Sequence, residues 1–297
     1  MNFFFEVLVG GLLSGVMYSL VALGFVLIYK ASGVFNFAQG AMVFFAVLSF
    51  VGFMELGLNF WLALPVTVAL MVVVGVVTER LVLRPLVGQS EDTLLMATIG
   101  LAFVIEGVAQ LAWGVKVRGL DLGIADVPMD WLADNADILV SQLDVAAGLV
   151  AGIMVAVLAL IFSKTKVGRG LRAVADDNAA ALSVGIPLKQ ILVVVWATAG
   201  VVALVAGMVW GARSGVQFAL VGVALKAMPV LIIGGFTSVP GVIVAGLIVG
   251  AAEKITEVYL GPFVGGGIEG WLPYVLAVLF LLVRPEGLFG EKIIRRV

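Results

Sequence analysis

The segment Ser163–Gln190, SKTKVGRGLRAVADDNAAALSVGIPLKQ, lies between two long apolar runs and decides how the chain is organised. The run before it is Leu143–Phe162, and the run after it is Ile191–Gly211. Each has about the 20 residues that an α-helix needs to cross the core of a bilayer. Lys and Arg concentrate in cytoplasmic loops, so the basic residues of this segment predict that it faces the cytoplasm. They are Lys164, Lys166, Arg169, Arg172 and Lys189.

One short helix is predicted inside this segment. Gly168 is a candidate start, Ala and Leu fill the middle, and Gly185-Ile186-Pro187 ends it. A short polar helix between two membrane spans is well placed to press on another protein at the membrane surface. The alternative is a solvated loop whose charges only fix the orientation of the chain in the membrane.

The composition indicates an integral membrane protein. Of the 297 residues, 63% are hydrophobic and 12% are charged, and the mean hydropathy is +1.22. A soluble domain is about 45–50% apolar and about 25% charged. The apolar runs are continuous, whereas the strands of a membrane β-barrel alternate, so the spans are helices. The predicted fold is an all-α, polytopic transmembrane helical bundle.

Several kinds of chemistry are excluded by missing residue types. The sequence has no Cys and no His, which removes disulfides, thiolate or imidazole metal ligands, and nucleophilic sites built on those residues. It has no G-x-x-x-x-G-K-[ST] loop, so the chain is not its own ATPase by that route. We therefore expect a transport subunit rather than an enzyme, with no cofactor and no nucleic-acid partner.

The apolar runs predict about seven to nine spans in a single transmembrane domain over residues 1–297. The first run lacks a basic start and a cleavage site, so it is interpreted as a retained span. Basic residues in loops 78–92 and 163–189 and in the tail predict a cytoplasmic C-terminus. The longer runs are Val7–Tyr29, Ala41–Leu56, Trp61–Val77, Thr93–Trp113, Leu143–Phe162, Ile191–Gly211 and Trp271–Val283, and the basic tail residues are Lys292, Arg295 and Arg296.

The region 219–258 is interrupted. It holds two apolar pieces, Ala227–Ile233 and Val242–Ala252, separated by Gly234–Gly241. An α-helix rises about 1.5 Å per residue, so neither piece alone is expected to cross the membrane. We expect either two tilted helices or a re-entrant hairpin. Short segments interrupted by Gly and Pro also point to the pathway of a transporter.

Polar residues within or beside the spans are candidates for the translocation pathway, because such residues usually face a bundle interior or a cavity. Glu106 is expected to pair with Arg213 or Lys226, as a structural ion pair or in transport. Asn36 and Gln39 break an apolar pattern, and a polar helix cap explains them equally well. The candidates are Tyr18, Asn36, Gln39, Glu106, Arg213, Gln217, Lys226 and Glu253.

The longest polar stretch is Gly114–Gln142, which is rich in Asp and poor in Lys and Arg. This balance favours the outer side of the membrane, with Trp131 at the interface. Such a loop could receive a delivery protein, or it could simply cover the bundle.

The segment Ser163–Gln190 resembles the cytoplasmic coupling loop of the branched-chain amino acid family of ABC importer permeases. A T/S-x-x-G-R-x-x-R-A-x-x-x-D/N-x-x-x-A-x-x-x-G-I run is typical there. In this sequence the run reads from Thr165 and Gly168-Arg169 through Arg172-Ala173, Asp177 and Ala181 to Gly185-Ile186. Four further strings match: Asn36–Gly40, Glu79–Pro85, Lys226–Glu253 and Arg284–Gly290. Gln39 replaces a common family His, and Thr237 replaces a usual Gly.

The resemblance implies a pore made with a homologous second permease in a bacterial or archaeal cytoplasmic (inner) membrane. Two cytoplasmic ABC ATPase subunits and a periplasmic or extracellular substrate-binding protein would complete an alternating-access importer. The small-molecule substrate would be a branched-chain amino acid, or in relatives urea, a short amide or an aromatic acid. An ATPase-independent secondary transporter is the alternative mechanism. The implied ATPase-coupling residues are Gly168, Arg169, Arg172, Asp176, Asp177 and Gly185.

Overall fold

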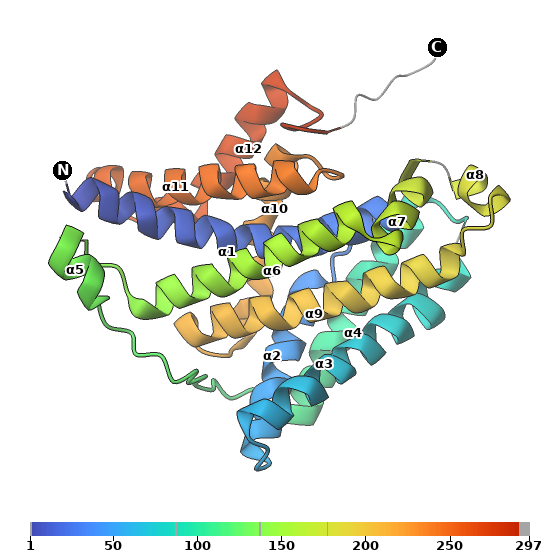
Figure 1. The fold of residues 1–297 in the computed structure, drawn as a ribbon, viewed down its shortest axis with the longest axis horizontal. Coiled ribbons are helices and arrows are strands. Elements are labelled where there is room, and N and C mark those ends of the chain that lie inside the picture. The colour runs from blue at the N-terminus through green and yellow to red at the C-terminus, as the bar shows by residue number, and fades with distance from the viewer. Residues whose placement is uncertain (1, 87, 137, 177, 291–297) are drawn as a thin grey trace. The chain divides into compact units, whose positions relative to one another are not determined.

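Helices account for all the regular structure that the computed structural model describes, which comprises residues 2–86, 88–136, 138–176 and 178–290 (Figure 1). Within these ranges the extended pairings are two isolated bridges, Arg118 with Val216 and Pro128 with Ser141. The predicted all-α fold is therefore confirmed.

Among the described residues, six helical stretches are long and apolar enough to cross a membrane. Together with three shorter apolar helices, the described apolar helices number nine, within the predicted range of about seven to nine spans. The long stretches are α1 (Asn2–Ser32), Phe60–Leu86, α4 (Glu91–Trp113), α6 (Gln142–Lys164), α9 (Leu188–Ser214) and α11 (Val239–Val264). Phe60–Leu86 consists of α3 (Phe60–Val77), the π-helical turn η1 (Thr78–Leu83) and η2 (Arg84–Leu86). The shorter helices are α2 (Gln39–Glu55), α10 (Gly222–Gly234) with η3 (Phe218–Val221) before it, and α12 (Leu272–Val283).

The chain divides into two compact units. Unit 1 comprises Met1–Leu23, Asp121–Val155 and Leu225–Val297, and unit 2 comprises Gly24–Leu120 and Ala156–Ala224. Three of the four boundaries fall within α1, α6 and α10, and the fourth falls between Leu120 and Asp121, in the stretch between α4 and α5.

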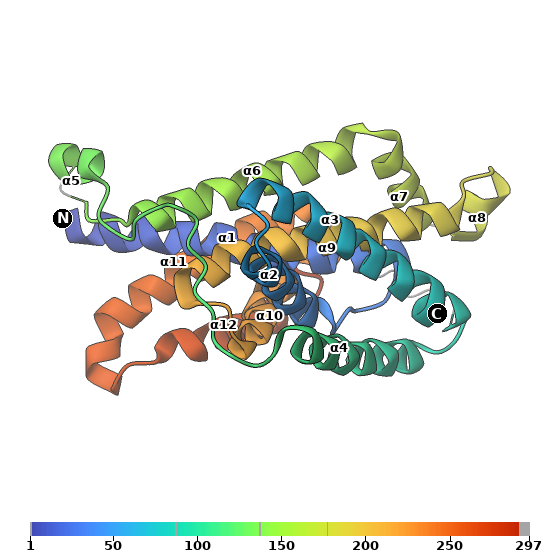
Figure 2. The same cartoon turned by 90° about the horizontal axis from the view of Figure 1, so that it is seen from below.

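Helix α2 forms the core of unit 2. It packs against α3, α4 and α9, and Figure 2 shows it nearly end-on among them. Every residue from Gln39 to Gly52 is buried. Small residues permit the close crossing of α3 and α9, because a Cβ at Gly75 would lie 2.7 Å from the Trp196 carbonyl oxygen. A polar side chain in α2 must therefore find its partner inside the protein.

Helices α1 and α11 form a close contact in unit 1. A Cβ at Gly15 would lie 2.4 Å from the Gly246 carbonyl oxygen, so the two backbones approach where neither has a side chain. Next to this crossing, the Ser19 hydroxyl donates to the Gly15 carbonyl at 2.9 Å. The small residues Gly11 and Gly15, four apart in α1, permit the close approach of the two helices.

The region 219–258 differs from the prediction in one respect. The first apolar piece is part of the short α10, but the second is part of α11, whose 26 residues are enough for a crossing. The expectation that neither piece crosses alone is therefore wrong for the second piece. The physical reason is that Glu253 and Glu257 have partners within the unit, so charged residues do not end the helix.

Residues 284–290, which follow α12, pack on the turn between α10 and α11. The backbone N–H of Leu288 donates to the Ile233 carbonyl at 2.7 Å. Gly235 in this turn has φ of +97°, a conformation that favours glycine. The basic tail residues Lys292, Arg295 and Arg296 lie outside the described residues, so the orientation of the C-terminus stays a prediction.

Candidate functional site

Two short helices occupy the loop between α6 and α9. They are α7 (Lys166–Asp176) and α8 (Asn178–Ser183), and Figure 1 shows them at the end of unit 2 where α9 begins. Residue 177 lies outside the described residues, so the single continuous helix stays a prediction. Helix α7 begins at Lys166 rather than at Gly168, because Thr165 caps it: the Thr165 hydroxyl accepts from the Gly168 N–H at 3.3 Å.

Helix α7 is held against both flanking spans. Its apolar side chains Leu171 and Val174 are buried. A Cβ at Gly168 would lie 2.1 Å from the carbonyl oxygen of Phe162, so the contact with α6 requires glycine. A Cβ at Gly170 would meet the end of the Ile191 side chain in α9 at 2.8 Å. The two glycines therefore serve packing between the loop and the spans.

The two predicted coupling arginines have different surroundings. The half-buried Arg172 donates to the carbonyl oxygen of Phe162 at 2.6 Å and to that of Ser163 at 3.4 Å. These carbonyls belong to the last turn of α6, where intrahelical donors are lacking and a cation is favourable. Arg169 is exposed, with one contact of 3.4 Å to the Lys164 carbonyl. Arg172 therefore joins the loop to α6, whereas Arg169 is presented outward.

Of the remaining predicted coupling residues, the structure describes the backbone of Gly185 and Asp176. Gly185 ends the α8 region with φ of +83°, and the Ile186 N–H donates to the Ala181 carbonyl at 3.0 Å, a glycine-based helix end. Asp176 is the last residue of α7, and Asp177 lies outside the described residues. Two apolar residues that the sequence analysis did not single out, Leu182 and Val184, are 54% and 74% exposed. Apolar residues in a loop otherwise rich in charge were the available signal.

Three of the predicted pathway residues meet in unit 1. The Tyr18 hydroxyl of α1 donates to Glu253 Oε1 of α11 at 2.9 Å. Lys226 Nζ of α10 lies 3.8 Å from the same oxygen. Glu253 is only 4% exposed, and its Oε2 has no hydrogen-bond partner among the described residues. The cluster joins three helices and leaves one buried carboxylate oxygen unsatisfied.

Two further pathway residues meet in unit 2. Residues 33–38 interrupt the helical backbone between α1 and α2, as expected. Asn36 and Gln39 are both buried, and Asn36 Nδ2 donates to Gln39 Oε1 at 3.3 Å. Asn36 Oδ1 also accepts from the Ala38 N–H at 3.1 Å in a local turn before α2, whose N-cap residue Ala38 has no side-chain cap hydrogen bond. Gln39 Nε2 has no partner among the described residues.

The other three candidates, Glu106, Arg213 and Gln217, all belong to unit 2. Glu106 is half-buried in α4 and forms no ion pair with the described residues of unit 2. Its expected pairing with Lys226, which belongs to unit 1, stays a prediction. Arg213 lies over the Trp210 ring, 5.8 Å from its centroid. Gln217 donates to the Ser214 carbonyl at 3.0 Å and so caps the end of α9.

The sequence analysis did not predict two polar contacts within unit 2. Thr98 of α4 donates to the Phe35 carbonyl at 3.1 Å and accepts from the Phe37 N–H at 3.3 Å, which holds the interruption in place. Arg84 binds Glu79 through both carboxylate oxygens, at 2.7 to 3.0 Å. The string Glu79–Pro85 was noticed, but its pairing depends on the π-helical turn η1, which aligns residues five apart.

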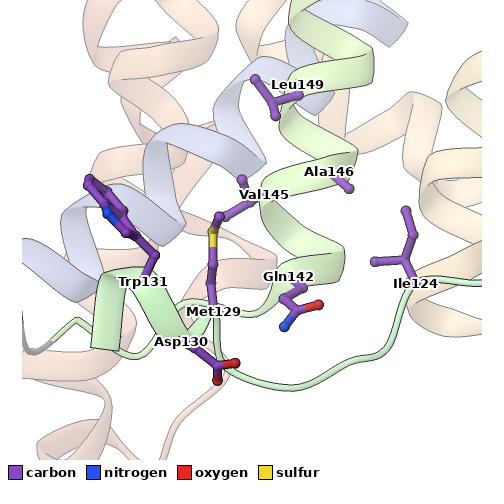
Figure 3. Close-up of a pocket in the computed structure, with 8 residues that line it drawn as sticks. All are labelled: Ile124, Met129, Asp130, Trp131, Gln142, Val145, Ala146 and Leu149. Carbon is purple, nitrogen blue, oxygen red and sulfur yellow. The ribbon is translucent and has the colours of Figure 1, made fainter. Parts of the chain in front are cut away.

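The long polar loop carries a short helix and an open cavity in unit 1. Helix α5 (Asp130–Ala136) and the start of α6 enclose about 500 Å³. Figure 3 shows Asp130 and Gln142 beside Met129, with Val145, Ala146 and Leu149 along α6. Trp131 at the rim is 67% exposed, and Ile124 completes the lining.

Comparison with known proteins gives a consistent result. The family described as "Branched-chain amino acid transport system / permease component" matches residues 7–283. The permease protein BraD of Pseudomonas aeruginosa, from a high-affinity branched-chain amino acid transport system, is 25% identical over 306 residues, covering 99% of this chain and 98% of that protein.

Two similar proteins are named LivH. The high-affinity branched-chain amino acid permease LivH of Escherichia coli K12 is 25% identical over 309 residues, with 99% and 98% coverage. A probable LivH of Methanocaldococcus jannaschii is 25% identical over 295 residues, with 96% and 92% coverage. A solved structure, PsaBC from Streptococcus pneumoniae in complex with Fab, aligns with a TM-score of 0.48 at 15% identity, covering 92% of this chain and 89% of that one, and this likeness is too weak to bear on function.

The family match covers nearly all the described helices, from the first span to the last. The apolar spans and their exposed apolar faces require a lipid environment. This chain is an integral membrane protein and belongs to the family of permease components of branched-chain amino acid transport systems.

Proposed function

We propose that this chain is the membrane-spanning permease subunit of an ABC importer and forms half of the translocation pathway for branched-chain amino acids. The observation that carries the proposal is the attachment of α7 to both spans beside it. Arg172 and Gly168 fix α7 to the end of α6, and Gly170 fixes it to the start of α9. A force on the loop is therefore passed to two membrane-spanning helices at once.

The force comes from two separate cytoplasmic ATPase subunits. They contact the exposed side of the loop, through Arg169 and the apolar residues Leu182 and Val184. Closure of the ATPases moves α6 and α9, and α9 packs directly on α2 and α3. The cavity between this chain and a homologous second permease then alternates between open-outward and open-inward states. In this arrangement residues 1–297 act as one permease domain.

The orientation follows from the same proposal. The loop 163–190 and the C-terminus face the cytoplasm of a bacterial or archaeal cell, and the chain lies in the cytoplasmic membrane. The stretch 114–142 then faces outward, where a substrate-binding protein delivers the solute. The open cavity beside Trp131 is the part of this stretch with an exposed aromatic side chain, which suits a protein contact.

The proposed pathway is lined by polar side chains of both units. The relatives named above support a branched-chain amino acid as cargo. Gln39 stands where the family commonly has His, and this substitution keeps urea, a short amide or an aromatic acid as alternative cargo. The proposed pathway residues are Tyr18, Asn36, Gln39, Glu106, Arg213, Gln217, Lys226 and Glu253.

The proposal is tested by reversing the charge of Arg169 in the complete transporter. We expect Arg169→Glu to abolish leucine uptake and the stimulation of ATPase activity, because a carboxylate replaces an exposed cation on the ATPase-facing side. Membrane insertion should be unchanged, because the side chain is exposed. The control is Lys116→Glu, the same charge change on an exposed residue of the outer stretch. Equal uptake by both variants would contradict the proposed role of the loop.

A further inference from the structure

A cavity of about 250 Å³ lies in unit 2 where α9 begins. Two charged side chains, Glu79 and Arg84, form part of its wall, and most of the remaining wall is apolar. The main apolar lining residues are Val34, Leu83, Leu94, Leu192 and Trp196.

The ion pair in this wall is built into the fold. Glu79 is only 2% exposed, and Arg84 binds its Oε1 through Nε and Nη2 at 3.0 Å and its Oε2 through Nη2 at 2.7 Å. Among the described residues Arg84 Nη1 makes no hydrogen bond, and Glu79 Oε2 accepts only one. A carboxylate has about four acceptor positions, so both groups can bind a further partner. The Arg84 side chain is 35% exposed, which gives a ligand access.

A carboxylate and a guanidinium side by side are complementary to a molecule that carries both charges. A ligand carboxylate suits Arg84, and a ligand ammonium suits Glu79. The lining also includes the uncharged polar residues Ser32 and Gln89, and its apolar part accommodates an aliphatic side chain. We propose that this cavity binds a zwitterionic α-amino acid with an apolar side chain.

The position of the cavity gives this binding a regulatory consequence, which rests on the proposed function. Leu188 and Leu192, at the start of α9, line the cavity, and α7 packs on the same helix. A ligand stabilises the arrangement in which its site is formed. Imported amino acid that accumulates on the ATPase side therefore holds α9 in place and slows further transport.

The test measures binding of radiolabelled leucine to the full-length chain with its partner subunits. The binding protein is omitted, because it would itself bind leucine, and the nanodiscs contain only phosphatidylglycerol. We expect saturable binding that Arg84→Gln weakens at least tenfold. Leu192→Trp should also abolish it by filling the cavity without changing a charge. The control is Arg80→Gln, an exposed arginine four residues earlier in η1 that does not line the cavity.

Three outcomes would overturn the inference. The first is wild-type binding that neither Arg84→Gln nor Leu192→Trp reduces. The second is the absence of saturable binding to the wild type. The third is displacement of leucine by phosphatidylethanolamine, whose headgroup is also zwitterionic, because the cavity would then be a lipid site. Leu192→Trp keeps the test decisive if removal of the Arg84 charge prevents folding.

A transport measurement separates this inference from the proposed function. Leucine loaded inside proteoliposomes should slow ATP-driven uptake by the wild type and have little effect on Leu192→Trp. A rate of wild-type uptake that is unchanged by internal leucine would refute the inference without contradicting the proposed importer function. Absence of ATP-driven uptake under all conditions would refute the proposed function instead.

Discussion

At the residue scale, the buried acid Glu253 has a partner that is remote in sequence, whereas the buried acid Glu79 pairs with Arg84 five residues away. Tyr18 and Glu253 are 235 residues apart, yet their side chains meet at 2.9 Å. The sequence indicated that Glu253 was a special position, but only the packing of α1 on α11 determines its partner. Glu106 shows the converse: an acid in a span predicted an ion pair, and the structure leaves it half-buried without one in unit 2.

These two acids give a direct comparison. We expect Glu253→Gln to lower the free energy of unfolding by about 1–3 kcal/mol, because Lys226 loses its counterion. Lys226→Met in the same chain should recover part of this loss, since it removes the unpaired charge. Glu106→Gln should have a smaller effect. Thermal unfolding in detergent checks the set, and an equal loss at both acids would contradict the assigned pairing.

At the element scale, the sequence located most helices but not their ends. The interruption at residues 33–38 was predicted, because polar residues and glycine break an apolar run. The full length of α11 was not predicted, because charged residues near the middle of a helix resemble the end of a helix until their partners are known. A charged residue ends an apolar run when only its sequence neighbours are considered. Inside a span, however, such a charge is stabilised by side chains that are distant in sequence.

The contact between α7 and α6 gives the prediction at this scale. Gly168→Ala should lower the unfolding free energy by about 1–3 kcal/mol, because the new Cβ collides with the Phe162 carbonyl. It should also reduce the coupling of ATP hydrolysis to uptake. Gly100→Ala in α4 is the matched control, since a Cβ there meets nothing within 4 Å. The measurements are thermal unfolding and uptake per ATP hydrolysed. Identical behaviour of the two variants would exclude the tight contact.

At the scale of the whole molecule, composition was sufficient to establish a helical membrane protein. The family resemblance of five strings was sufficient to indicate a transport permease, and the family match over residues 7–283 bears this out. The pathway itself was less predictable. Three of its candidate residues form a cluster within unit 1 and two form a hydrogen-bonded pair within unit 2, and residue type alone does not determine these partners.

The central claim is that separate ATPase subunits engage the loop 163–190. The chain has no cysteine, so Leu182→Cys introduces a unique cross-linking position on the exposed side of the loop. The most direct measurement is the cross-link from this residue to copurified ATPase subunits, with Leu149→Cys, 60% exposed on α6, as the control position. We predict a cross-link at position 182 whose yield changes when ATP binds, and none at position 149. A complex that transports leucine with ATP but gives no cross-link at position 182 would contradict the account.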